Sequence, residues 1–528
     1  MSAETQQASA PLDYQTLLEI ITDEKGKPID KWEITALLET NGYRDVDAAT
    51  DYKVPDLFAL AELLYVYINS PAYKPKEIKV EKSNIVIRVV KNYLKGMLFA
   101  VPMIIQIVSM TIVGFGIWSS IDFTLRDATV IAFATLLALA LTGGITQIIG
   151  RKGMFYLKMD ENILAANITR TLYLVGLLQL LILSVAFVII NLFAKLFPSD
   201  MFMLFIAYFV LLSVFFTALA IFYMLEAYFT ISLIVFSGLV FVYIFYLVLG
   251  FSIFVSQYLS LIFAIVIANA ASFYRMAKLK RESKSEGFAL PRPAALVYTI
   301  YPYFIYGSFY FAFIVMDRLL AWTTGDHYLP YFVWFNYPYE VGLDWALIPL
   351  IFTIALEEVF IYELGVFAYR KINEFKSLEV AYFNNHFKRV YYIAALTFLL
   401  MGILSVIFAY YIPFIFSYNE GFFKFLSVFF NKIHILVFFL ASTGYIFLSW
   451  ALLNCIIFFA YSRPDFAIKS IIFGTLTNFL VGMVASRAFS YYYAVLGLTI
   501  GGFVFAAVST YYGLRFFKRY DYYYYSAY

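Results

Sequence analysis

The sequence predicts an all-α polytopic membrane protein with about twelve transmembrane helices behind a small soluble domain, and three observations support this prediction. Hydrophobic residues fill 63% of the 528 positions and charged residues fill 14%. Soluble domains contain about 45–50% hydrophobic residues and about 25% charged residues. The apolar residues occur in blocks of about twenty, the length that crosses roughly 30 Å of hydrocarbon. Lys and Arg gather in alternate loops between these blocks, as they do in membrane proteins.

Residues 1–70 are expected to form a small helical domain in the cytoplasm, because charges recur every few positions and no apolar stretch reaches membrane length. Leu12–Ile21 is the first predicted helix. Asp30 and Glu33 have the spacing of a capping box, which predicts a second helix that ends at Gly42. We expect no cleavable signal peptide in this region.

Pro55 at a first-turn position predicts a third helix over Asp56–Ile68. Three short helices form a marginally stable unit, so we expect them to contact a partner or the cytoplasmic face of the membrane part. Two interpretations stay open, a docking module and a terminal cap without a specific partner. Residues 71–96 are a basic linker to the first span.

Twelve spans follow from the apolar blocks. Tyr228–Tyr274 carries no charge and is too long for one crossing, so we expect it to turn back near Gly250 and supply two spans. The other ten predicted spans are Met97–Trp118, Ala128–Ile149, Thr171–Phe193, Met201–Tyr223, Ala295–Met316, Leu343–Gly365, Val390–Tyr411, Ile433–Phe459, Phe466–Ala485 and Tyr491–Phe517.

Loop charge orients these spans, because Lys and Arg accumulate on the cytoplasmic side of short loops. One set of loops is rich in both residues, which places the two termini in the cytoplasm and favours an even number of crossings. The alternate loops hold few cations, namely Arg126, Lys195, Arg318, Lys424, Lys432 and Arg487.

The spacing of the basic segments repeats along the chain. A basic connector, Arg151–Arg170, follows the second span, and another, Arg370–Arg389, follows the eighth. The longest basic loop, Arg275–Arg292, separates six helices from six. We therefore predict two six-helix bundles, an arrangement typical of secondary transporters that rock around a site near the bilayer midplane. The predicted segments are 97–274, 275–294 as the linker, 295–517, and a Tyr-rich cytoplasmic tail, 518–528.

Three carboxylates in the eighth span are candidates for a substrate path, because charge inside a span is costly and is usually functional. Glu357 and Glu358 lie past the middle of the span, and Glu363 follows one to two turns later. They could line a path that accepts cations. The alternative is that all three lie near the helix end and pair with Arg370 and Lys371.

Other charged positions are weaker candidates. Asp317 and Arg318 close the seventh span, where they could line the path or form a local pair at the outer interface. Glu226 is expected to be a solvated residue of the hairpin between the fourth and fifth spans. Arg487 is expected to be an ordinary charge of an outer loop.

Aromatic residues make up 21% of the chain. Four of them around one outer loop are candidate sugar contacts, namely Tyr331, Trp334, Tyr337 and Tyr339. The alternative is an interfacial belt, in which a ring lies in lipid and a polar tip lies in water. The tail residues Tyr522–Tyr525 suggest a membrane-surface anchor or a phosphorylation cluster.

Several functions lack the residues they need. Cys455 is the only cysteine, and His327, His386 and His434 are scattered, so we expect no metal site, disulfide or redox chemistry. Walker, HExxH and GxSxG motifs are missing, so no ATPase or hydrolase site, and no cofactor, is expected. The net charge of +3 is spread along the chain, which argues against a nucleic-acid partner.

Three short motifs resemble a known family. Met316-Asp317-Arg318 with Trp322, then Tyr337-Pro338-Tyr339-Glu340, and then Ala346-Leu347-Ile348-Pro349 resemble the PelG-like exopolysaccharide exporters, which are distant relatives of the multidrug/oligosaccharidyl-lipid/polysaccharide flippases. The resemblance covers roughly Lys91 to Arg519. It implies an inner-membrane protein that passes an amino-sugar-containing polysaccharide outward, together with a cytoplasmic glycosyltransferase and membrane scaffold proteins.

We therefore expect a polysaccharide translocator that needs no covalent chemistry and contacts membrane lipids and its polymer. Glu357 and Glu358 would suit a cationic polymer. Two alternatives stay open. One is a membrane scaffold for a polysaccharide synthase, which the N-terminal domain and the tail favour. The other is a membrane-embedded glycosyltransferase, which needs an acidic pair on an outer loop; Asp122, Asp127, Asp326 and Asp344 do not form an obvious one.

Overall fold

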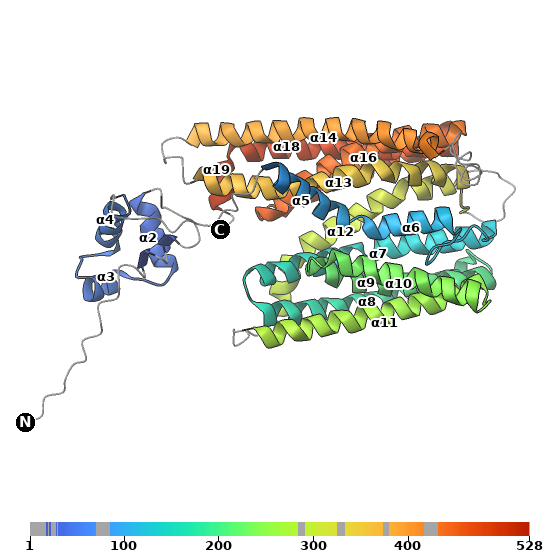
Figure 1. Cartoon of the computed structure of the whole chain (residues 1–528), viewed down its shortest axis with the longest axis horizontal. Helices are drawn as coiled ribbons and strands as arrows, with labels where there is room; N and C mark the ends of the chain where they lie inside the picture. The colour runs from blue at the N-terminus through green and yellow to red at the C-terminus, as the bar shows by residue number, and fades with distance from the viewer. Residues whose placement is uncertain are drawn as a thin grey trace, which may run out of the picture.

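The structure is a computed structural model that describes residues 17–18, 21–22, 28, 30–69, 85–283, 291–324, 333–372, 380–416 and 431–526. Within these residues the secondary structure is helical, with no strand beyond an isolated bridge between Phe115 and Ser120. A small N-terminal unit lies beyond one end of a bundle of long helices (Figure 1).

The N-terminal unit contains three fully described helices, α2 (Lys31–Thr40), α3 (Asp45–Asp51) and α4 (Leu57–Ile68). Asp30 caps α2, because its side chain accepts a hydrogen bond from the Glu33 N–H at 2.9 Å. Gly42 follows with a φ of +88°, a left-handed conformation that favours glycine after a helix. Most of the predicted helix Leu12–Ile21 lies outside the described residues.

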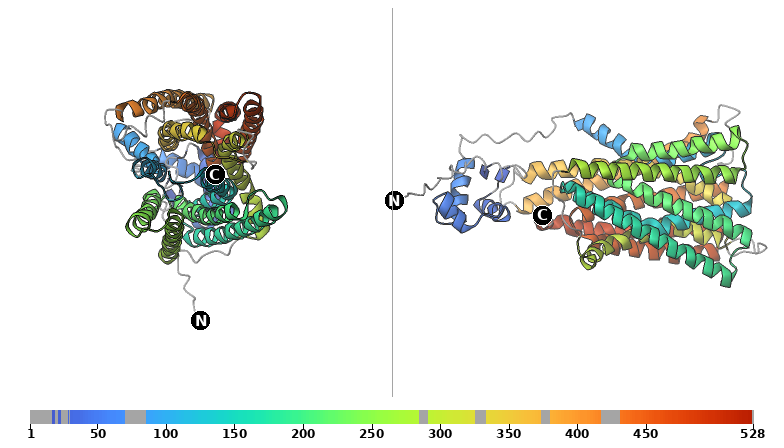
Figure 2. Two further views of the ribbon diagram at one scale, coloured as in Figure 1. Left: turned by 90° about the vertical axis from the view of Figure 1, so that its right-hand side faces the viewer. Right: turned by 90° about the horizontal axis from the view of Figure 1, so that it is seen from below.

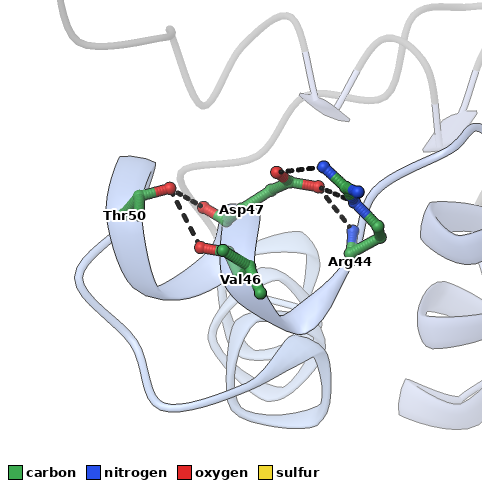
Figure 3. A network of polar contacts seen from close by, with 4 residues as sticks. All are labelled: Arg44, Val46, Asp47 and Thr50. Carbon is green, nitrogen blue, oxygen red and sulfur yellow. Dashed lines mark hydrogen bonds and ion pairs between the residues drawn. The ribbon is translucent and has the colours of Figure 1, made fainter.

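Helix α3 was not predicted, because it is short and polar and has no apolar repeat. A local network defines it (Figure 3). The Arg44 backbone N–H donates to Asp47 Oδ2 at 2.9 Å, and the Arg44 Nε donates to the same oxygen at 3.3 Å. The Thr50 hydroxyl donates to the Val46 carbonyl at 2.9 Å. The hydrogen bonds from the side chain and then the backbone of Arg44 hold the pKa of Asp47 below its ordinary value.

Eleven helices in the described part of the chain are long and apolar enough to cross a membrane. A further pair, α5 (Ile85–Leu98) and α6 (Val101–Ile112), brings the number to twelve if it counts as one bent span. The eleven are α7 (Leu125–Lys158), α8 (Asn162–Ala194), α9 (Ser199–Met224), α10 (Tyr228–Tyr243) with the π-turn η1 (Ile244–Val248), α11 (Ile253–Glu282), α12 (Pro293–Trp322), α13 (Tyr337–Ile372), α14 (Val380–Phe416), α16 (Lys432–Ala460), α17 (Pro464–Ala488), and the short η4 (Tyr491–Ala494) with α18 (Val495–Lys518).

The predicted first span, Met97–Trp118, is wrong as a single helix. Helices α5 and α6 meet at a bend of 56°. Pro102 lies in the first turn of α6, where its missing N–H is tolerated, but its ring prevents α5 from continuing through it. The chain then turns at Gly114, which has a φ of +85°. The turn predicted at Gly250 is present, with a φ of +69°.

The basic stretch Arg151–Arg170 does not form a separate connector. Helix α7 includes the first eight residues of this stretch and ends at Lys158, and α8 begins at Asn162. Asp160, in the turn between them, has a φ of +58°. The two spans are therefore longer than the hydrocarbon thickness and carry their own charges beyond it.

The long helices form two halves with separate hydrophobic cores (Figures 1 and 2). We call α6–α11 the first half and α12–α19 the second half, where α19 (Tyr520–Tyr525) is a short C-terminal helix. Helix α12 packs against α7 of the first half and α17 of the second. A Cβ on Gly307 of α12 would lie 2.6 Å from the Gly143 carbonyl oxygen of α7. The two backbones therefore touch where the halves meet, and we call this zone the seam.

Candidate functional site

The bent pair α5–α6 is divided between the halves. Helix α5 packs on α13 of the second half, and α6 packs on α10 of the first (Figure 1). A Cβ on Gly96 would lie 2.6 Å from the Ala355 carbonyl oxygen and 2.9 Å from its Cα, so α5 and α13 are in backbone contact. The Tyr93 hydroxyl also donates to the Phe352 carbonyl at 3.2 Å. The bend at the start of α6 therefore lies between two bodies.

Ion pairs fix α5 on α13. Arg88 holds Glu363 through two hydrogen bonds, at 2.6 and 2.7 Å, and the Arg88 side chain is buried. Lys95 donates to Glu358 at 2.7 Å and to Glu226, in the α9–α10 hairpin, at 3.2 Å. Lys95 therefore links a carboxylate of each half. Glu226 lies in the predicted hairpin, but it is an ion-pair partner as well as a solvated residue.

Glu357 occupies a different environment from its neighbour Glu358. It is buried in the second half, and its Oε1 has no hydrogen-bond partner among the described residues. Tyr310 of α12 and Cys455 of α16 lie within electrostatic range of it. The structure thus separates the three carboxylates predicted to act together, because two face α5 and one faces the core.

Arg151 crosses the seam from the other side. It lies on α7 of the first half, and its guanidinium carbon is 4.7 Å from the centre of the Phe459 ring, on α16 of the second half. This is the geometry of a cation–π contact. This contact could not be predicted from local patterns, because the two residues are more than 300 positions apart.

Asp317 and Arg318 lie inside the second half and do not pair with each other. Asp317 accepts a hydrogen bond from the Tyr339 hydroxyl at 2.7 Å. Arg318 forms an ion pair with Glu340. Its Nη2 also lies 3.0 Å from Asp344 Oδ1. Neighbouring residues on an α-helix point about 100° apart, so the predicted local interfacial pair is wrong. The separation of four between Glu340 and Asp344, which puts both on one helix face, could have identified them as partners.

The four aromatic candidates do not form one surface in the described structure. Tyr339 is fully buried and Tyr337 is half-exposed, with its ring 6.4 Å from that of His434. Trp334 lies just before α13 and lines a cavity. Tyr331 lies outside the described residues.

A cavity of about 590 Å³ is lined by the N-terminal ends of α7, α9 and α11 together with Trp334, and we call it the seam cavity because residues of both halves line it. Arg126 and Asp200 face each other there at 3.1 Å. Nearby, the Phe335 N–H donates to the Thr129 hydroxyl at 3.0 Å, which joins the second half to α7. Eight of the lining residues come from the first half and Trp334 from the second: Thr124, Leu125, Arg126, Asp127, Asp200, Met201, Leu204, Phe254 and Trp334.

Solved structures identify this arrangement of helices. A MATE protein in complex with MaD5 aligns with a TM-score of 0.56 and 14% sequence identity, over 84% of this chain and 99% of that one. The chain has the fold of a MATE transporter. A MOP-superfamily transporter from Pyrococcus furiosus, described as having a binding pocket of reversed polarity, aligns with a TM-score of 0.55 and 14% identity, over 84% and 99% of the two chains.

A third structure is the outward-facing conformation of a multidrug resistance MATE family transporter of the MOP superfamily. It aligns with a TM-score of 0.51 and 16% identity, over 84% of this chain and 98% of that one. No protein-family model and no curated protein sequence matches the chain. At this level of identity the three structures show the fold that this chain shares with them.

In this chain the MATE fold ends in α19, so the Tyr-rich tail is folded onto the second half. Tyr520 is fully buried. Asn384 donates to the Asp521 carboxylate at 2.7 Å and accepts from the Asp521 N–H at 3.0 Å. Arg463 lies over the Tyr523 ring at 5.1 Å. In the described part of the chain, no group of three or more His, Cys, Asp or Glu residues could hold a metal ion.

Proposed function

We propose that the protein exports a polysaccharide across the cytoplasmic membrane by movement of its two halves around the seam. The single observation that carries this proposal is the seam cavity, in which Trp334 of the second half faces charged and aromatic side chains of the first. A site built from both halves changes shape when the halves move, which is the principle of alternating access.

The chemistry of the cavity suits a sugar. Trp334 and Phe254 offer ring faces on which the C–H face of a pyranose can stack. Arg126 offers N–H donors, and Asp127 and Asp200 offer carboxylate acceptors for hydroxyl or ammonium groups. Two carboxylates against one guanidinium favour a cationic amino sugar over an anionic one. The resemblance of the Tyr337-Pro338-Tyr339-Glu340 segment to exopolysaccharide exporters supports the same substrate class.

Movement of the halves is compatible with the contacts at the seam. Gly143 and Gly307 present no side chains of their own at the crossing of α7 and α12, where Phe311 and Gln147 pack over them. Lys95 binds carboxylates of both halves, and its side chain is 41% exposed. Such a partly exposed bridge is weak enough to break and re-form. Loop charge places Lys95 on the cytoplasmic side and the cavity on the outer side.

Export in cells tests the proposal. Deletion of the gene is expected to remove surface polysaccharide and to leave polymer inside the cell, with normal synthase abundance. Trp334→Ala and Asp200→Asn should each lower surface polymer several-fold, because they remove a stacking face and an acceptor from the cavity. Trp334→Phe keeps a ring and is the matched control, which should retain most of the export.

Unchanged surface polymer in the deletion strain would contradict export and favour another cargo or the scaffold role. Loss of both surface and internal polymer would favour the glycosyltransferase. Glu357→Gln should be tested apart from Glu358→Gln, because only Glu358 is bound to Lys95. Normal export in Glu357→Gln would remove this residue from the path. A cytoplasmic glycosyltransferase and membrane scaffold proteins remain the proposed partners.

A further inference from the structure

The outer face of α4 in the N-terminal unit is exposed and mostly apolar, with one carboxylate, Glu62, which pairs with Lys31 at 3.3 Å. Its inner face packs in the core of the unit, through residues such as Leu60 and Leu64. The outer face carries Phe58, Leu63 and Val66, which are 48%, 51% and 64% exposed. Trp32 of α2 extends it, with its ring 5.3 Å from that of Phe58. Large apolar side chains gathered on an exposed face often mark a contact surface.

The charge around this face is strongly negative. Residues 30–69 contain three cations, Lys31, Arg44 and Lys53, against eight carboxylates: Asp30, Glu33, Glu39, Asp45, Asp47, Asp51, Asp56 and Glu62. An acidic unit is repelled by an anionic membrane surface. Two copies of it would also repel each other. The occupant of the apolar face should therefore be cationic and should offer an aromatic or apolar contact.

The C-terminal end of the second half offers these properties. Lys518 and Arg519 are exposed at the junction of α18 and α19. Tyr522 is 58% exposed, and Arg463 lies 5.8 Å from the centre of its ring. One carboxylate, Asp521, lies beside these cations and accepts a hydrogen bond from Asn384, so the cations outnumber it three to one. The surface therefore combines an aromatic ring with three cations.

The tether brings the two surfaces together. Residues 69–84, sixteen in number, separate α4 from α5, and a chain of this length can span up to about 55 Å when extended. Arg88 fixes the start of α5 to Glu363 of α13. Aromatic rings connect α13 to α19. The ring centres of Phe367 and Phe387 are 5.4 Å apart, and those of Phe387 and Tyr520 are 4.2 Å apart. The unit and α19 lie at the same end of the bundle (Figure 2).

We propose that the N-terminal unit docks, through Trp32, Phe58, Leu63 and Val66, onto the α18–α19 surface of the same chain. The short tether gives the docking a high effective concentration. Docking joins two parts of the protein that the transport mechanism does not use. It also makes the unit move with the second half, on which α5 already packs.

Photo-cross-linking of the full-length protein tests the docking. The photoreactive residue p-benzoylphenylalanine replaces Tyr522, and the purified protein is irradiated in nanodiscs. We expect intramolecular cross-links to peptides within residues 31–68. The same residue at Tyr511, which is exposed on α18 inside the membrane-spanning part, is the control and should not reach these peptides.

Charge reversal separates docking from chance proximity. Lys518→Glu with Arg519→Glu should lower the cross-link yield at Tyr522 at least five-fold, because it replaces attraction by repulsion. Lys278→Glu with Arg281→Glu, at the end of α11 in the first half, is the matched control and should leave the yield unchanged. The yield should also fall with added salt, since the Debye length drops from about 10 Å at 0.1 M to about 3 Å at 1 M.

Three outcomes would overturn the docking. They are the absence of cross-links to residues 31–68, cross-links only between two copies of the protein, and a cross-link yield that is unchanged by the charge reversal. Phe58→Ser with Val66→Ser adds an independent check, because it removes the apolar contact from the other side and should lower the yield to a similar extent. None of these measurements requires transport, so failure of docking and failure of polysaccharide export are distinguishable.

Discussion

The two halves of the bundle share an architecture but differ in what they bury. In the described part of the first half, the buried polar side chains are hydroxyls and amides, such as Thr169, Ser213 and Gln257. The second half buries Asp317, Glu340 and Glu357. Burial of an ionisable group at the centre of a span costs about 2.5–3.5 kcal/mol. The protein therefore concentrates its costly polar groups in one half.

This asymmetry shows how each half holds its helices together. The first half relies on packing and on single hydrogen bonds, such as that from Tyr173 to Asn269 at 2.6 Å, and its Arg126–Asp200 ion pair is exposed. The second half joins α12 to α13 through a charged network, and it also binds α5 through ion pairs. Removal of one charged partner should therefore damage the second half more than removal of a hydroxyl damages the first.

The largest effect is expected for Arg318→Met. This change leaves Glu340 buried without its cation, although the Trp322 indole still donates to it at 2.8 Å. Loss of one partner from a buried pair costs about 3–5 kcal/mol. The free energy of unfolding, measured by SDS titration in mixed micelles, should fall by about that amount.

A second substitution checks the cause of this loss. Arg318→Met combined with Glu340→Gln should recover most of the stability, because Gln is neutral and keeps an oxygen for the Trp322 indole. If the double variant is as unstable as Arg318→Met alone, the loss comes from the packing of the Arg318 side chain and the proposed asymmetry fails.

The next largest effect should come from Gly96→Leu. The new side chain would enter the backbone of α13 at Ala355 and separate α5 from the second half. Overpacking of this kind costs about 1–3 kcal/mol. Gly150→Leu on α7 is the matched control, since nothing lies within 4 Å of a Cβ built there. Equal stability of the two variants in thermal unfolding would show that α5 is not anchored on α13.

A smaller effect is expected in the first half for Tyr208→Phe. The change removes one buried hydrogen bond, from the Tyr208 hydroxyl to Gln257, and keeps the ring. Single hydrogen bonds between membrane helices contribute about 0.6 kcal/mol on average. A loss above about 2 kcal/mol in the same SDS titration would show that the first half also depends on individual polar contacts.

The smallest effect lies outside the membrane, at Asp47. Its folded pKa is lowered by Arg44, so its contribution to stability is present above the unfolded pKa of about 3.9 and is lost as the pH falls through the folded value. Hydrogen exchange of residues 31–68, corrected for intrinsic rates, should show this loss below about pH 4. Asp47→Asn should remove the pH dependence. A loss of protection near pH 6 would point to another group.

Much of the fold could be predicted because it follows from local chemistry. The cap at Asp30, the turns at Gly42 and Gly250, and the membrane-length apolar blocks were predicted correctly. Each of these features depends on residues that are close together in the sequence. The break before α6 was missed, because a hydropathy window averages Pro102 with its apolar neighbours. Helix α3 was missed because its signal is a side-chain network and has no apolar period.

The candidate site was less predictable, because its partners are distant in sequence. Glu358 and Glu363 were identified as unusual, but their partners Lys95 and Arg88 lie more than 260 positions earlier. Trp334 was identified as aromatic, but its place in a cavity depends on α9 and α11, which belong to the other half. Spacing along one helix cannot reveal contacts between bundles.

The pairing of α5 with α13 also has a consequence for how the protein is made. Arg88 and Glu363 are 275 residues apart, and synthesis at about 5–20 residues per second takes roughly 14–55 s to cover that distance. During this interval α5 has been synthesised but α13 has not, so Arg88 lacks the carboxylate that it binds in the folded protein. The strongly amphipathic sequence of α5 suits it to wait on the bilayer surface. Completion of the second half would then bring α5 into place, so the first helix of the membrane part to be translated would be among the last to assemble.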